Sequence, residues 1–225
     1  KDKWGGSFEN RARLLQLILQ KVRESVGNNF ILAVKINSSD FQKGGLEISD
    51  SVKIANLIEK ENIDFIEVSG GNFEAPEAYQ YVSLKESTKS REAYFLDAAK
   101  NIKASVSIPI MVTGGFRSIS VMEDALRSSS TDLIGIGRPF VIDPSFPYKL
   151  LNGDISVLPA VERNFPPVQD IPKGAVLNWF CNQLAIQGKT GKGDINIPLI
   201  DGHERYIKQS DEATHSLISF RNDSK

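Results

Sequence analysis

Four short segments rich in glycine and polar residues each directly follow an apolar stretch of strand length. The two most informative are Thr113-Gly114-Gly115 and Gly135-Ile136-Gly137-Arg138. Glycine lets backbone N–H groups approach an anion closely, and the N-terminus of a following helix adds a favourable dipole. Arg138 can add a charge-assisted, bidentate contact to a phosphate, worth about 1.5–3 kcal/mol. Together these segments predict a site for a phosphorylated ligand.

The other two segments are Lys35-Ile36-Asn37-Ser38 and Ser69-Gly70-Gly71. Lys35 lies near the end of an apolar strand, where it either extends to solvent along the strand or points its ammonium group into a cleft. The glycines after Thr113 could form only a tight turn, and Arg138 could pair with a surface carboxylate. The occurrence of all four segments at successive strand ends favours the ligand site over these separate explanations.

The order of the predicted elements explains why the four segments would meet. Predicted helices lie between Ser7 and Gly27 and over about 49–60, 91–105 and 118–127, and predicted strands cover 30–36, 63–68, 108–112 and the DLIGIG stretch. A long loop rich in Tyr and Ser precedes the third helix. Helices and strands alternate, and the strands are nearly continuously apolar, which indicates a parallel sheet buried on both faces. In such folds ligands bind at the carboxyl ends of the strands.

Composition excludes several classes of function. The net charge of −1 over 225 residues gives no basic patch for nucleic acid, and no apolar run is long enough to span a membrane. A single cysteine, Cys181, excludes an internal disulfide framework and suits a reducing compartment. Its place on an apolar helical stripe predicts a buried structural thiol. We therefore expect a cytoplasmic protein with no nucleic-acid partner, no membrane partner and no metal site.

The C-terminal part of the sequence has a different character. Beyond Gly153 several prolines interrupt the chain before an amphipathic segment near Trp179. The region after Gly188 is polar and glycine-rich, which indicates a loop with one terminal helix. We therefore predict a first domain over 1–153 and a C-terminal extension over 154–225 with one or two helices. His203 and His215 are expected to be ordinary surface or tail histidines.

The N-terminal residues D-K-W-G-G-S-F-E-N-R-A-R resemble the D-x-[WY]-G-G-S-x-x-N-R-x-R segment of the old yellow enzyme family, the FMN-dependent NADH:flavin oxidoreductases. The likeness continues through AVKINSSDFQKGG, IEVSGGNFE, REAYF, IPIMVTGGFRS and DLIGIGRPF. This resemblance implies a (β/α)8 TIM barrel with FMN at the carboxyl ends of the strands, of which the four strands here would be strands five to eight. It also implies that hydride passes from NADH or NADPH through the flavin to a small-molecule electron acceptor, usually an alkene conjugated to a carbonyl or nitro group.

The resemblance also implies roles for individual residues. Lys35 would lie beside the flavin pyrimidine ring, where a cation stabilises the reduced anion. The FMN phosphate would contact Gly115, Gly137 and Arg138, and Ser69 and Gly70 would lie close to the cofactor. Gly114 is also expected among the cofactor-binding residues. The family's substrate-binding His/His or His/Asn pair and its tyrosine proton donor belong to earlier strands. These residues would lie upstream of Lys1, so no catalytic residue is expected in this sequence.

Since the family carries an N-x-R element directly before the D-x-[WY]-G-G segment, we expect a fragment of a longer oxidoreductase that is inactive alone. Two alternatives remain: a half-barrel that pairs with a second copy or with a separate N-terminal half, and a non-catalytic flavin- or phosphate-binding remnant. Another phosphate-binding barrel, such as an isomerase or a lyase, is disfavoured because the strand ends lack a pair of acidic residues for proton transfer.

Overall fold

The computed structural model describes residues 2–71 and 92–223, which form two compact units. The first unit ends at Gly135, and the second begins at Ile136. The division predicted after Gly153 concerns which residues belong to a barrel, so it stays a prediction.

Some of the segments used in the sequence analysis lie outside the described residues. They are Lys1, the loop rich in Tyr and Ser, the last three residues of the IEVSGGNFE motif and the first residue of REAYF. The family's substrate-binding residues were predicted upstream of Lys1, outside this sequence, so that expectation stays a prediction.

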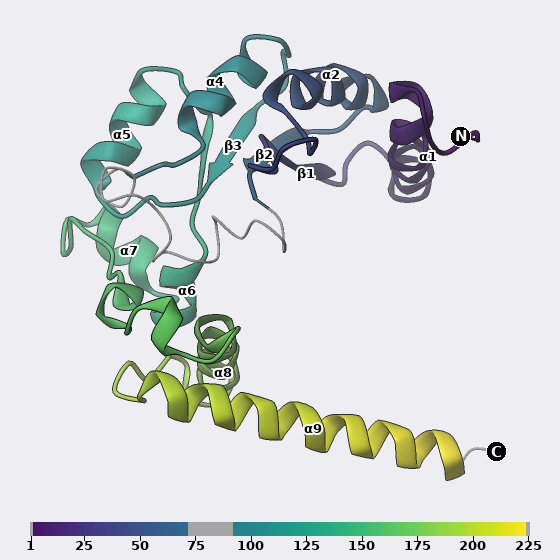
Figure 1. Cartoon of the computed structure of the whole chain (residues 1–225). Coiled ribbons are helices and arrows are strands. Elements are labelled where there is room, and N and C mark those ends of the chain that lie inside the picture. Colours follow the sequence, from purple (N-terminus) through teal and green to yellow (C-terminus); the bar gives the residue numbers. More distant parts are fainter. Residues whose placement is uncertain (1, 72–91, 224–225) are drawn as a thin grey trace. The chain divides into compact units, whose positions relative to one another are not determined.

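The first unit contains a four-stranded parallel sheet, which confirms the predicted α/β class. The strands β1 (Ala33–Asn37), β2 (Phe65–Ser69), β3 (Ile110–Thr113) and β4 (Leu133–Gly135) are adjacent in chain order. The helices are α1 (Phe8–Val26), α2 (Ile48–Ile58), α4 (Leu96–Lys103) and α5 (Ile119–Arg127), and η1 (Glu59–Glu61) is a short 3-10 helix (Figure 1). Helix and strand alternate as the sequence predicted, with the carboxyl ends of the strands at one edge of the sheet.

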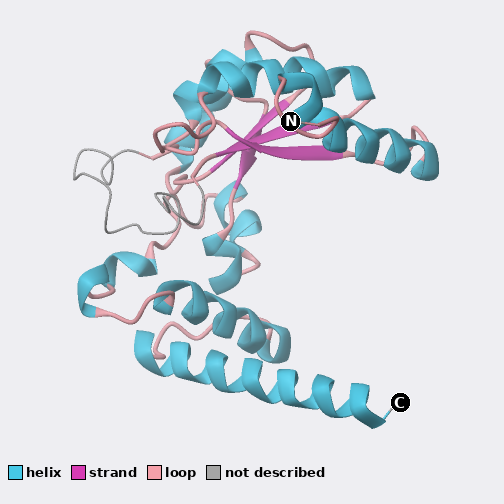
Figure 2. Cartoon of the chain, turned by 45° about the vertical axis from the view of Figure 1, so that its right-hand side comes forward, coloured by secondary structure: helices cyan, strands magenta, loops and turns pink. Residues whose placement is uncertain are grey.

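Only one face of this sheet is buried, whereas the sequence predicted burial on both. Along β1 and β2 every second residue is buried and its neighbours are exposed or half-buried. The buried positions are Val34, Ile36, Ile66, Val68, Ile110 and Val112. Figure 2 shows the helices of this unit gathered on one side of the sheet. Lys35, Glu67 and Thr113 therefore lie on the opposite face, since successive side chains of a strand point to opposite sides.

Two predicted boundaries move for local reasons. The strand β1 begins at Ala33 instead of Phe30 because side chains bind the preceding backbone: the Phe30 carbonyl accepts a hydrogen bond from Arg23 (2.7 Å), and the Leu32 N–H donates to Asp64 (2.7 Å). The helix α4 begins at Leu96, because Ala93 has a φ of 56°, which is incompatible with a right-handed helix.

The second unit is helical within its described residues. Its elements are α6 (Arg138–Ile142), α7 (Phe146–Leu151), η2 (Val161–Asn164), η3 (Val168–Asp170), α8 (Ala175–Thr190) and α9 (Leu199–Asp223). Its core consists of Ile142, Ala175, Trp179, Phe180 and Leu199. After Gly188 the chain forms a loop and one terminal helix, as predicted: α8 continues only to Thr190, and α9 begins at Leu199 and covers 25 residues.

Two other expectations for the second unit change. His203 is buried, and its Nδ1 lies 3.0 Å from the Nδ2 atom of Asn178, so it is not a surface residue. His215 is exposed on α9, as expected. Cys181 is only half-buried.

Within residues 2–71 and 92–223, no helix combines the length and apolar character that crossing a membrane requires.

Arg23 connects α1 to the chain around β1 and β2. Its guanidinium donates to the carbonyls of Asn62 (2.8 Å), Gly27 (2.9 Å) and Phe30 (2.7 Å), and to Asp64 Oδ2 (2.7 Å). The Arg23 side chain is only 10% exposed. One cation thus satisfies three carbonyl groups that lie outside regular secondary structure.

We expect Arg23→Met to lower the free energy of unfolding by about 2–4 kcal/mol, because the three carbonyls lose their donor. Urea denaturation of the full chain would measure this change. The matched control is Lys21→Met on the same helix, whose side chain is 79% exposed; its effect should stay within about 0.5 kcal/mol. Equal effects of both substitutions would contradict the role of Arg23.

The same contact predicts a dependence on pH. The Leu32 N–H and the Arg23 guanidinium both lower the pKa of Asp64. A folded-state pKa below the unfolded value gives stability that is present above about pH 4 and is lost as the pH falls through the folded pKa. Arg23→Met removes one of the two causes, so in urea denaturation the variant should lose less stability than the parent chain on acidification below about pH 4.

Candidate functional site

Lys35 lies on the sheet face away from the helices and pairs with a carboxylate on the neighbouring strand. Lys35 and Glu67 are partners in the β1–β2 register, and Lys35 Nζ lies 2.5 Å from Glu67 Oε1. The two side chains are 54% and 20% exposed. The ammonium group is therefore held at the sheet surface yet remains open to solvent. Glu67 was not among the predicted site residues, although a charged residue in the middle of each of two adjacent apolar strands was a usable signal.

Ser69 belongs to a network that ties the ends of β1 and β2 together. Its hydroxyl donates to Asn37 Oδ1 (3.3 Å), and Asn37 Nδ2 in turn donates to Asp40 Oδ1 (3.1 Å) and to the Gly71 carbonyl (2.8 Å). The Ser38 N–H donates to the Ser69 carbonyl (2.6 Å). These bonds fix the positions of polar groups at the edge where the sequence predicted a ligand.

The glycines after β2 and β3 give room to aromatic rings. A Cβ atom at Gly70 or Gly114 would lie 2.7 or 2.8 Å from the ring of Phe95, and one at Gly115 would lie 2.9 Å from the ring of Tyr94. Gly114 and Gly115 also have φ angles of 139° and 83°, which other residues rarely adopt. Ring packing and backbone conformation thus each explain a glycine at these positions without any ligand. Both support the alternative that the glycines after Thr113 form a tight turn.

The N-terminus of α5 already binds a carboxylate of this chain. Glu92 Oε2 accepts hydrogen bonds from the backbone N–H groups of Arg117 (2.6 Å) and Ser118 (2.7 Å), and its Oε1 accepts one from the Ser118 hydroxyl (2.5 Å). A helix N-terminus favours an anion, and Glu92 provides one. The dipole expected to favour a phosphate thus already acts on Glu92 at α5, and the phosphate site itself stays a prediction.

In the second unit, Arg138 follows a glycine with free space around it. Apart from its two chain neighbours, no described residue has an atom within 4 Å of the position that a Cβ would take at Gly137. Arg138 Nη1 lies 2.9 Å from Glu162 Oε1, and the two side chains are 27% and 2% exposed. The ion pair that the sequence analysis kept as an alternative does exist, but its carboxylate is buried, not at the surface.

The six predicted cofactor residues divide between the two units. Lys35, Ser69, Gly114 and Gly115 lie in the first unit, on or just beyond the parallel strands β1, β2 and β3. Gly137 and Arg138 lie in the second unit. Their roles toward a cofactor stay predictions.

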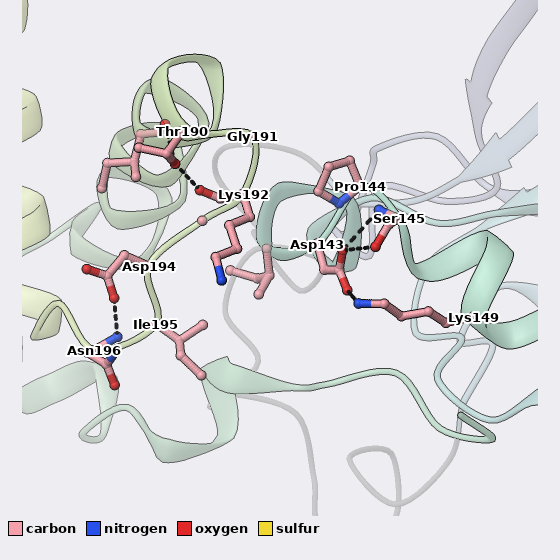
Figure 3. A pocket seen from close by; sticks show the side chains of 13 residues that line it. Asp143, Pro144, Ser145, Lys149, Thr190, Gly191, Lys192, Asp194, Ile195 and Asn196 are labelled. Carbon is pink, nitrogen blue, oxygen red and sulfur yellow. Dashed lines mark hydrogen bonds and ion pairs between the residues drawn. The ribbon is translucent and has the colours of Figure 1, made fainter. Parts of the chain in front are cut away.

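The second unit also has a cleft of about 770 Å³. It is lined by Ile142, Asp143, Pro144, Ser145, Lys149, Ile186 and 190–196, none of which is among the six predicted residues. Figure 3 shows Lys149 and Ser145 both pointing toward Asp143, and their hydrogen bonds hold the pKa of that carboxyl below its usual range. The lining also contains Lys192 and Asp194, so its two lysines are matched by two aspartates and the cleft has no clear preference for an anion.

Comparison with known proteins identifies the family. The sequence profile of the NADH:flavin oxidoreductase / NADH oxidase family matches residues 1–154. The chain belongs to this family. It is 37% identical over 200 residues to the NADH-dependent flavin oxidoreductase iliE of Neonectria sp. (strain DH2), a match that covers 83% of this chain and 25% of that protein. It is 35% identical over 211 residues to iccE of Talaromyces variabilis, with 85% and 50% covered.

Solved structures agree with this assignment. A 2-naphthoyl-CoA reductase complex is 32% identical, with a TM-score of 0.63 over 70% of this chain and 24% of that chain. The old yellow enzyme homologue of Zymomonas mobilis is 20% identical, with a TM-score of 0.52 over 78% and 45%, and supports the fold alone. The predicted family, whose cofactor is FMN with NADH or NADPH as reductant, is confirmed. This chain spans only a quarter to a half of the length of the first curated relatives it matches.

The contact between β3 and β4 gives a direct test of the packing near the strand ends. A Cβ at Gly135 would lie 1.8 Å from Thr113 Oγ1 and 2.8 Å from Thr113 Cβ. We expect Gly135→Ala to lower the free energy of unfolding by about 1–3 kcal/mol through overpacking. In Gly188→Ala, the control, the new Cβ meets no described residue within 4 Å beyond its chain neighbours and the backbone of its own helix. This control should be neutral or stabilising by up to about 1 kcal/mol, because alanine favours a helix. A Gly135→Ala chain as stable as its parent in urea would show that β3 and β4 accommodate the added methyl group, contrary to this expectation.

Proposed function

We propose that this chain carries part of the FMN site of an NAD(P)H-dependent oxidoreductase, and that its Arg138 binds the FMN phosphate. The observation that carries the proposal is the state of Arg138. Arg138 follows a glycine that has open space around it among the described residues. Its side chain is partly exposed, and its guanidinium pairs with a buried carboxylate in a chain of the NADH:flavin oxidoreductase family.

The residues present fit a phosphorylated flavin. Gly137 leaves space for a ligand next to the backbone, and the contact through Nη1 leaves the other guanidinium donors of Arg138 for phosphate oxygens. In the first unit, the Lys35 ammonium is exposed on a sheet face that no helix of that unit covers, within its described residues. Both cations can thus meet an anionic ligand without breaking the core.

Each group has a distinct task in this proposal. Bound FMN supplies the hydride chemistry between NADH or NADPH and the acceptor. Arg138 and Gly137 bind the phosphate, and Lys35 offsets negative charge that develops on the flavin. Glu67 keeps the Lys35 ammonium at the sheet surface. Ser69, Gly114 and Gly115 shape the edge of the sheet that faces the cofactor.

The rest of the proposal concerns the complete protein. We propose that β1 to β4 are strands five to eight of a TIM barrel, whose interior includes the sheet face with Lys35 and Glu67. The other strands, which would bind a small-molecule acceptor such as an activated alkene, come from an N-terminal half or from a second copy of the chain. The family membership and the parallel sheet with one uncovered face support this arrangement.

Flavin binding by the purified chain tests the proposal. The chain should retain visible flavin absorption after excess FMN is removed, and it should bind FMN more tightly than riboflavin, which lacks the phosphate. Arg138→Ala should weaken FMN binding about 10-fold and leave riboflavin unchanged, because a charge-assisted contact is lost. The control Arg127→Ala, whose side chain is 69% exposed, should change neither. If FMN binds no more tightly than riboflavin, the phosphate is not recognised and the proposal fails.

The role of Lys35 is tested in a fusion of this chain to the N-terminal part of the Talaromyces variabilis relative. We expect the fusion to oxidise NADH or NADPH. Lys35→Met should slow flavin reduction at least about 10-fold, because it removes a cation that stabilises the developing charge. Stopped-flow absorbance would measure the rate, with the exposed Lys100→Met on α4 as control. An unchanged rate of reduction in Lys35→Met would refute the role assigned to this lysine.

A further inference from the structure

We propose that Glu162 is the positioning residue for Arg138, and that the C-terminal segment beyond the family-matched residues thereby completes the phosphate site. The family match ends at residue 154, and Glu162 follows it in the 3-10 helix η2. This inference rests on the proposed function of Arg138 and adds a residue to it. It gives the C-terminal segment a task in cofactor binding.

The geometry of the pair is asymmetric. Glu162 is buried, with 2% of its side chain exposed, and its Oε1 atom lies 2.9 Å from Arg138 Nη1. The Arg138 side chain is 27% exposed. The carboxylate thus binds one end of the guanidinium from inside the protein while part of the arginine remains accessible. This is the arrangement expected when one residue orients another toward a ligand.

Glu162 is itself held by the core of the second unit. Its neighbour Val161 and nearby Phe165 pack against the cluster around Trp179, and the Phe165 and Trp179 rings lie 5.1 Å apart, edge to face. The Phe165 N–H donates to the Glu162 carbonyl (3.3 Å), which closes the short turn. The position of the carboxylate therefore depends on α8, which provides Trp179.

Charge and entropy favour a role in binding. A flexible arginine loses rotamer freedom when it is ordered, which lowers the affinity for the ligand that orders it. If Glu162 has already ordered Arg138, phosphate binding does not carry that cost, and the guanidinium keeps its remaining N–H groups for the ligand. A buried carboxylate is costly unless it is paired and hydrogen-bonded, so the contact with Arg138 stabilises Glu162 in turn.

Two substitutions at Glu162 test this inference in the full chain. Glu162→Gln keeps the shape and one acceptor oxygen but loses the charge, whereas Glu162→Ala loses the contact. FMN and riboflavin affinities would be measured by fluorescence titration, with Glu212→Gln on the exposed part of α9 as the matched control. We expect Glu162→Ala to lower the affinity for FMN about 10-fold and to leave the affinity for riboflavin unchanged. The FMN affinity of Glu162→Gln should lie between those of Glu162→Ala and the parent chain, and the control should match the parent.

The same titrations in an Arg138→Ala background separate positioning from general structure. There Glu162→Gln should leave FMN affinity unchanged, because the group that it positions is gone. Equal losses for FMN and riboflavin, or an equal loss in the Arg138→Ala background, would show a structural role and overturn the inference. An increase in FMN affinity would show that the carboxylate competes with the phosphate, and would overturn it too.

The design distinguishes this inference from the proposed function. If the parent chain binds FMN no more tightly than riboflavin, the proposed function fails, and the inference fails with it. If the parent chain prefers FMN and both Glu162 variants keep the full preference, only the inference fails. If Glu162→Ala does not fold, the near-isosteric Glu162→Gln decides alone. A reduced preference of Glu162→Gln for FMN over riboflavin supports the inference, and a full preference overturns it.

Discussion

The alternation of burial along the parallel strands is the constraint on which the first unit depends. Residues such as Ile66 and Val112 are fully buried on the helix side of the sheet. Because side chains alternate with a period of two, a shift of one residue would expose this whole set. The register that buries it also places Lys35 opposite Glu67 and Thr113 opposite Gly135. The polar face is therefore a consequence of packing on the other side.

Glycine at the strand ends satisfies two demands that the sequence alone could not separate. Close approach to an anion and close approach of an aromatic ring both exclude a Cβ, so both select glycine at that position. Near Gly70, Gly114 and Gly115 the excluding groups are the rings of Phe95 and Tyr94. Near Gly137 no described residue beyond its chain neighbours fills the corresponding space. This contrast makes Gly137, more than the glycine pair after β3, the position where a ligand explains the residue.

The elements and the candidate cations could be predicted from the sequence, because they depend on local periodicity and residue type. Ser7 does cap α1 by accepting the Asn10 N–H (3.3 Å), and Gly27 ends that helix with a φ of 73°. The carboxylates that pair with these groups could not be predicted. Glu67 and Glu162 lie 32 and 24 residues from the cations they bind, and the sequence holds 28 acidic residues among which to choose. His203 was misjudged for the same reason, since its partner Asn178 lies on another helix.

Both cations that the sequence singled out are paired, and this affects how an anion would be bound. Lys35 with Glu67 and Arg138 with Glu162 are each neutral as pairs, and the whole chain carries a net charge of only −1. Such a chain exerts little long-range attraction on an anionic ligand, and salt screens what remains beyond roughly 8–10 Å. Affinity for a phosphate must then come from short hydrogen bonds, whose strength depends on orientation. A guanidinium fixed by a buried carboxylate meets that requirement better than a free surface arginine, which would bring more net charge but less order. The ion pair thus gives up long-range attraction for geometric precision at the point of contact.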